Sequence, residues 1–76
     1  MNESRTRLLQ CFAAVFPELT SAQAESASAE SISGWDSVAT VTLAALIEEE
    51  FACSVEPEDY EKMTSFQGCL HLVESR

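Results

Sequence analysis

The stretch Gly34–Phe51, GWDSVATVTLAALIEEEF, is the longest helical pattern in the chain, and the fold is best worked out from it. The pattern predicts a helix that begins near Asp36 or Ser37 and ends at Phe51. Asp36 is the predicted N-cap, because its carboxylate can accept a backbone N–H of the first turn. Gly34 supplies the turn before it.

Apolar residues lie on two sides of this helix. One row has the spacing of a core face and consists of Ala39, Leu43, Leu46, Ile47 and Phe51. The second row, which we name the mixed stripe, combines small apolar side chains with carboxylates: Val38, Val41, Thr42, Ala45, Glu48 and Glu49. The mixed stripe fits a partner helix or a basic groove, and it equally fits a helix sandwiched in a bundle with both rows partly buried.

Before this helix, apolar residues at helical spacing predict another helix over Ser4–Phe16. Pro17 ends it, because proline disfavours the helical conformation of the residue before it. The segment 18–34 is rich in Ser, Ala and Glu and is predicted to be a long loop, in which alanine permits a transient helical turn.

After it, residues 52–55 are expected to be extended, and Pro57 followed by acidic residues predicts a short helix within 56–61. Thr64 and Gln67 have the spacing of a capping box that opens a last helix. Gly68 weakens that helix, which must depend on tertiary packing. The expected fold is all-α, a small four-helix bundle in a single domain, 1–76, with three longer helices, a short third helix and a long loop between helices one and two.

Composition describes a small acidic globular protein. The 76 residues are 46% hydrophobic, and 4 Lys+Arg against 13 Asp+Glu give a net charge of −9. Nucleic acid is not an expected partner, because binding it requires basic side chains. No apolar run approaches the ~20 residues that span a bilayer, and the N-terminal residues lack the apolar part of a signal peptide. We expect a cytoplasmic, monomeric protein that binds no membrane.

The three cysteines are odd in number and widely spaced, which favours reduced thiols. Cys11 and Cys69 are expected in the core, and Cys53 nearer the surface. No metal site is expected, since no Cys-x-x-Cys pair exists and His71 is the only histidine.

Asp36-Ser37-Val38, at the start of an apolar helix that ends in Glu-Glu-Glu-Phe, resembles the Asp-Ser-Leu motif and second helix of acyl carrier proteins. The segments 57–59 and 63–66 are similar to the family's third and fourth helix positions, so the resemblance covers most of residues 4–74. Departures from the family pattern concern partner identity more than the carrier role. They are Val38 for leucine, Thr42 where many fatty-acid carriers have an acid, Ala45 for a larger side chain and Ala52 for glycine.

The resemblance implies that Ser37 receives 4′-phosphopantetheine from coenzyme A through a separate Mg²⁺-dependent phosphopantetheinyl transferase. Acyl or polyketide groups would then be carried as thioesters on the arm's thiol. Asp36 would serve both as helix cap and as a carboxylate that the transferase and its metal recognise. The mixed stripe would face partner enzymes. A helix N-terminus suits an attached phosphate, because unpaired N–H groups and the helix dipole favour negative charge there.

The chain is expected to be a freestanding carrier and not an enzyme. Ser37 has no adjacent base in the sequence, because His71 lies in the last helix. Its partners would include enzymes such as an acyltransferase, an adenylating ligase or a ketosynthase. Trp35 before Asp-Ser is similar to discrete carriers of specialised biosynthesis, although its ring could simply cover the end of the bundle. Two alternatives stay open: an aminoacyl or peptidyl carrier, and a noncovalent interaction module with the carrier fold.

Overall fold

The central helix, α3 (Ser37–Phe51), has the predicted bounds. Asp36 is its N-cap, with an extended backbone and a carboxylate that accepts the N–H of Ala39 at 2.9 Å. At the other end, Ala52 takes the left-handed conformation, with φ at 51°, and donates its N–H to the carbonyl of Glu48. Glycine is the usual residue in such a C-cap, so the alanine is a local exception.

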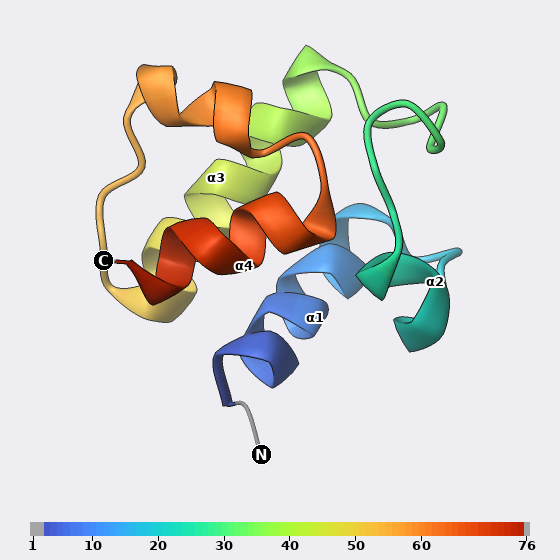
Figure 1. Cartoon of the computed structure of the whole chain (residues 1–76), viewed down its shortest axis with the longest axis horizontal. Coiled ribbons are helices and arrows are strands. Elements are labelled where there is room, and N and C mark those ends of the chain that lie inside the picture. The colour runs from blue at the N-terminus through green and yellow to red at the C-terminus, as the bar shows by residue number, and fades with distance from the viewer. Residues whose placement is uncertain (1–2, 76) are drawn as a thin grey trace.

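The structure is a computed structural model that describes residues 3–75, and its regular elements there are all helical (Figure 1). The other elements are α1 (Glu3–Val15), α2 (Ser21–Glu25), the 3₁₀ helix η1 (Pro57–Lys62) and α4 (Phe66–Glu74). The all-α prediction is confirmed, and α1 agrees with the predicted helix to one residue at each end. Within the described residues, no helix is both long and apolar enough to cross a membrane.

The long loop predicted over 18–34, where the sequence analysis allowed only a transient helical turn, contains the short helix α2. Thr20 Oγ1 accepts the N–H of Gln23 at 3.1 Å, and Gln23 Oε1 accepts the N–H of Thr20 at 2.9 Å. This reciprocal capping box satisfies two donors that a helix start otherwise leaves unpaired. Ala24 is buried as part of the core, so the short helix also has tertiary support.

The predicted capping box of the last helix is also wrong. Ser65, not Thr64, is the N-cap of α4, and its Oγ accepts the N–H of Gly68 at 3.0 Å. The Thr64 carbonyl instead accepts the N–H of Ala29 at 2.7 Å, and the Gln67 side chain donates to the carbonyl of Glu25. Pairing with the distant segment before α3 keeps residue 64 out of the helix.

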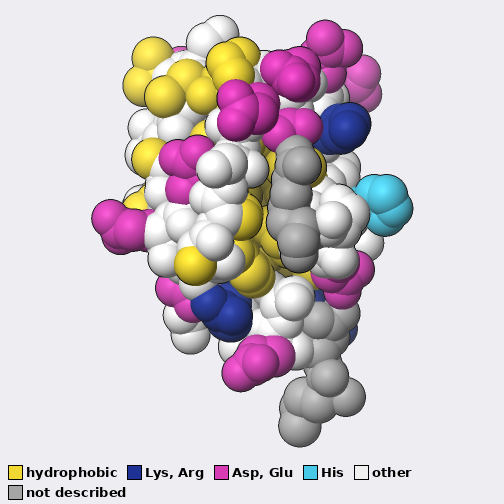
Figure 2. Space-filling model, turned by 90° about the vertical axis from the view of Figure 1, so that its left-hand side faces the viewer, with side chains coloured by type: hydrophobic (Ala, Val, Ile, Leu, Met, Phe, Trp, Pro, Cys, Tyr) yellow, Lys and Arg dark blue, Asp and Glu magenta, His cyan; other side chains and the backbone are white. Residues whose placement is uncertain are grey.

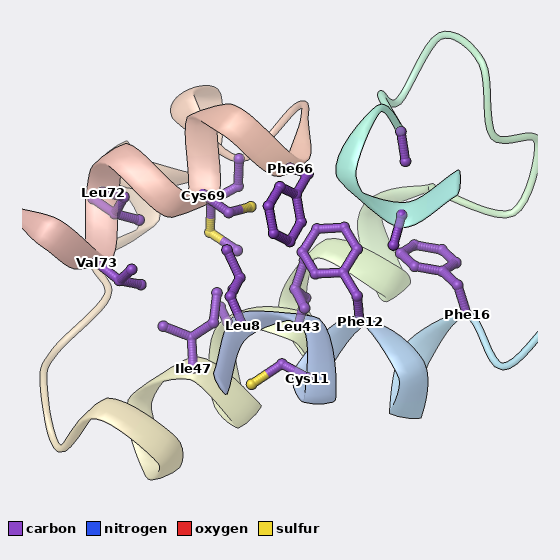
Figure 3. Packing of buried hydrophobic residues seen from close by; sticks show 14 of the residues in the cluster. Leu8, Cys11, Phe12, Phe16, Leu43, Ile47, Phe66, Cys69, Leu72 and Val73 are labelled. Atoms are coloured by element: carbon purple, nitrogen blue, oxygen red, sulfur yellow. The ribbon is translucent and has the colours of Figure 1, made fainter. Parts of the chain in front are cut away.

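The core lies where α1, α3 and α4 meet, and Figure 3 shows their side chains pointing toward one another. Leu43 and Ile47 of the predicted core row are fully buried. Ala39, Leu46 and Phe51 are only half-buried, whereas Ala44, which the sequence analysis left out, is buried. The core face of α3 is therefore rotated toward Ala44.

The cysteines behave as predicted. Cys11 and Cys69 are buried, Cys53 is half-buried, and all three are free thiols. Burial raises the pKa of Cys11 to about 11 and that of Cys69 to about 12, so both stay protonated at neutral pH. The two buried thiols therefore act as small apolar core groups.

Gly68 is required by a close approach between α4 and the end of η1. A Cβ at this position would lie 2.2 Å from the carbonyl oxygen of Lys62. We expect Gly68→Ala to lower the free energy of unfolding by about 1–3 kcal/mol, the usual cost of overpacking. Helix propensity alone predicts the opposite, a gain of ~1 kcal/mol. Urea denaturation followed by circular dichroism decides between the two.

Gly34→Ala is the matched control, because a Cβ there meets nothing within 4 Å and Gly34 does not use a positive φ. Gly34 lies in the turn before α3, as predicted, but this turn does not require glycine. We expect this variant to change the free energy of unfolding by less than about 0.5 kcal/mol. If Gly68→Ala and Gly34→Ala unfolded at the same urea concentration, the close approach at Gly68 would be contradicted.

Candidate functional site

Ser37 is the first residue of α3, and it is exposed. The carbonyl of Asp36 accepts the N–H of Thr40 at 2.9 Å, and the Asp36 carboxylate accepts that of Ala39. Among the described residues, no acceptor meets the backbone N–H groups of Ser37 and Val38. The serine hydroxyl therefore lies beside two donors that can face an anion, at the positive end of the helix dipole.

A surface groove of about 460 Å³ adjoins Ser37. Its walls come from the first two turns of α3 and from η1, and the lining residues are Ser37, Thr40, Val41, Tyr60 and Glu61. Tyr60 and Glu61 were not predicted as site residues, because only the fold brings η1 against α3. The groove therefore places an open surface beside Ser37.

The mixed stripe lies on the exposed side of α3, so it is not sandwiched in the interior. All of its residues are exposed: Val38, Val41, Thr42, Ala45, Glu48 and Glu49. Val38 is 73% exposed and Val41 51%, and they are the large apolar side chains most open to solvent among the described residues. Thr42 donates its hydroxyl to the carbonyl of Val38, so that hydroxyl is bonded within the helix.

The acidic triplet at the end of α3 divides into three different environments. Glu48 accepts the N–H of Val55 at 2.8 Å and so holds the segment that follows the helix. Glu50 binds the guanidinium of Arg7 at 2.8 Å. Within residues 3–75, the Glu49 carboxylate has neither a hydrogen bond nor an ion pair. Glu49 is therefore the member of the triplet whose charge is most available to a partner.

Arg7 joins α1 to the end of α3. It also donates to the backbone carbonyl of Glu50, and its guanidinium carbon lies 4.7 Å from the ring centre of Phe51. One of the few basic side chains is thus used inside the fold. Acidic side chains clearly outnumber basic ones on the face that Figure 2 shows.

Trp35 is buried beside the site. Its ring lies 5.5 Å from that of Phe12 and 5.3 Å from that of Phe16, and its indole N–H donates to Thr40 Oγ1 at 3.2 Å. The ring is therefore part of the hydrophobic core. The bond to Thr40 was missed, and only the Trp-x-x-x-x-Thr spacing hinted at it.

The chain's one histidine lies away from Ser37. His71 is exposed on α4 and does not line the groove beside Ser37. In the described part of the chain, no group of three or more His, Cys, Asp or Glu side chains is placed to hold a metal ion. Fold and site together define a small acidic helical domain with an exposed serine at a helix start. No family model matches the chain.

Proposed function

We propose that this chain is an acyl carrier protein whose Ser37 bears 4′-phosphopantetheine. The observation that supports this proposal best is the exposed serine at the first position of α3, directly after the Asp36 cap and beside a groove. In this proposal, α1, α3, η1 and α4 are the four helices of an acyl-carrier-type bundle. The short α2 is then an additional helix in the α1–α3 connection.

The residues around Ser37 fit the group chemically. The unpaired N–H groups of Ser37 and Val38 suit a phosphodiester, and the groove lined by Tyr60 offers a flexible arm a surface to lie on. The arm supplies a thiol that carries acyl groups as thioesters. The carboxylate of Asp36 keeps the helix start in place and leaves one edge for the transferase and its metal ion.

Attachment requires one bond to form and one to break. Ser37 Oγ bonds to the phosphorus that carries the pantetheine portion of coenzyme A. The P–O bond that joins this phosphorus to the rest of the pyrophosphate breaks, and adenosine 3′,5′-bisphosphate leaves. The hydroxyl proton passes to a base of the transferase.

We propose an acyl or polyketide cargo, loaded and removed by enzymes that act on the carrier from outside. The net charge of −9 supports this choice over an aminoacyl or peptidyl cargo. The exposed apolar pair Val38 and Val41, followed by Glu49, supports docking to a surface that combines apolar and basic side chains.

Intact mass spectrometry tests the proposal. The folded protein is incubated with coenzyme A, Mg²⁺ and a broad-specificity phosphopantetheinyl transferase, with a known carrier as the positive control. We expect one phosphopantetheine increment, and peptide mapping should assign it to Ser37. A folded protein that gains no mass while the control is fully converted would contradict the carrier role and favour the noncovalent interaction module.

Docking through the mixed stripe predicts a salt-dependent effect of charge. Glu49→Lys should slow association with the transferase severalfold at low ionic strength, because the charge of Glu49 is exposed and unpaired within residues 3–75. The effect should shrink as salt screens the charge. The measurement is the dependence of kcat/KM for modification on salt concentration.

Two control variants separate docking from other effects. Glu18→Lys makes the same change in net charge at an exposed position between α1 and α2 and should have little effect. Glu48→Gln removes a charge from the stripe but keeps an oxygen that can accept the N–H of Val55, so it should slow association without loosening the fold. If Glu49→Lys and Glu18→Lys had the same kcat/KM for modification at low salt, the assignment of the docking surface would be contradicted.

A further inference from the structure

We propose that Trp35 and Thr40 are a positioning pair that fixes the start of α3, and with it Ser37, for the transferase. This inference rests on the proposed function. Neither residue is assigned a reacting role. They act on Ser37 through the backbone of the turn that carries it.

The pair is anchored in the core. Trp35 is 6% exposed, and its ring contacts those of Phe12 on α1 and Phe16 directly after α1. Phe12 is fully buried, with its ring 5.1 Å from that of Phe66 on α4. The position of the indole is therefore set by two helices that are remote from Ser37 in sequence, and close packing resists its rotation.

The indole N–H links the fixed ring to the first turn of α3 through a hydrogen bond. It donates to Thr40 Oγ1 at 3.2 Å, and the backbone N–H of Thr40 donates to the carbonyl of Asp36 at 2.9 Å. On the other side, the N–H of Asp36 bonds to the carbonyl of Gly34 and that of Trp35 to the carbonyl of Ile32. Together these hydrogen bonds hold the backbone on both sides of residues 36 and 37.

These hydrogen bonds stabilise a part of the helix that has few others. A first helical turn has few hydrogen bonds of its own, and the connection from α1 to α3, residues 16–36, contains α2 as its one short helix. Without the indole bond, the N-cap contact of the Asp36 carboxylate with Ala39 would have to hold the residues before Ser37 in place. A nucleophile must be held in a narrow range of positions to react quickly, so loosening the turn should slow modification at Ser37.

Thr40 also lines the groove, and a change there could act on the groove itself. Trp35→Phe separates the two effects, because it removes the indole N–H and leaves Thr40 unchanged. The test is a double-mutant cycle of Thr40→Val, Trp35→Phe and the double variant, with Thr40→Ser as the variant that keeps the hydroxyl. Each protein is compared by kcat and KM for phosphopantetheine transfer.

We expect Thr40→Val and Trp35→Phe each to lower kcat about three- to tenfold, the range for loss of one hydrogen bond, with KM nearly unchanged. The double variant should be no slower than the slower single variant, and Thr40→Ser should restore most of the rate. Circular dichroism should show all four to be folded under assay conditions. A merely structural role would leave kcat unchanged in these folded variants.

The outcomes distinguish the two proposals. If the parent protein is not modified, the proposed function fails. If the parent is modified and the single variants have the same kcat as the parent, only the proposal of the positioning pair is contradicted. The same holds if the effects of the two substitutions on kcat multiply in the double variant. Tryptophan emission adds an independent readout, since Trp35 is the only tryptophan. Thr40→Val should alter its emission and Thr40→Ser should not; identical spectra for all three proteins would also contradict the bond.

Discussion

Ser37→Ala should abolish modification by coenzyme A and a phosphopantetheinyl transferase, with no mass increment under conditions that convert the parent fully. The variant lacks the oxygen to which phosphorus would bond, and no neighbouring residue of α3 lies at the same place after the cap. The fold should be unaffected, because Ser37 is exposed and Asp36 still caps the helix through Ala39. Alanine is also a good helix former.

Ser33→Ala is the matched control, since it removes an exposed hydroxyl four residues earlier. It should be modified like the parent. Both variants should unfold at urea concentrations close to that of the parent, within about 0.5 kcal/mol of its stability. Modification of Ser37→Ala would show that another residue is the attachment site. Loss of modification together with loss of helical signal would contradict the exposed position of Ser37.

The elements predicted correctly are those whose signals are local. Asp36 and Pro17 act on their immediate neighbours, so α3 and α1 have nearly the expected bounds. The start of α4 could not be read this way, because the pairing of Thr64 with Ala29 joins residues far apart in the chain. The helix α2 is different: Thr20 and Gln23 are a local signal that was present and overlooked.

In the candidate site, too, some features follow from the local sequence and others depend on contacts between distant residues. Helical periodicity sufficed to place Ser37 at a helix start and the mixed stripe on one face. The different environments of Glu48 and Glu50 depend on Val55 and Arg7, which reach them only in the folded chain. The bond from Trp35 to Thr40 depends on which way the indole turns, and that is decided by packing against α1.

These contacts connect the core with the site through aromatic rings. Phe12 touches Phe66 of α4 on one side and Trp35 on the other, and Trp35 bonds to the first turn of α3. The ring of Phe12 therefore supports both the packing of the helices and the turn that presents Ser37. A substitution at Phe12 should therefore lower the stability of the fold, and it should also alter the position of Trp35 beside Ser37.

Phe12→Ala should lower the free energy of unfolding by about 3–5 kcal/mol, as expected for a fully buried phenylalanine. A domain of 76 residues has a total stability of about 4–11 kcal/mol, so much of the folded population would be lost on mild warming. Phe51→Ala removes the same atoms from a half-buried position and should cost clearly less. Urea denaturation of both variants, compared with the parent, measures the difference.

Phe12→Leu keeps the protein folded and tests the second effect. Leucine fills much of the same volume, so the cost should stay near 1–1.5 kcal/mol. The Trp35 ring would lose its edge-on aromatic partner at 5.5 Å, and the tryptophan emission of the folded variant should shift. If Phe12→Ala cost no more than Phe51→Ala, Phe12 would not be a central core residue. An unchanged emission in Phe12→Leu would mean that the core does not hold the indole beside Ser37.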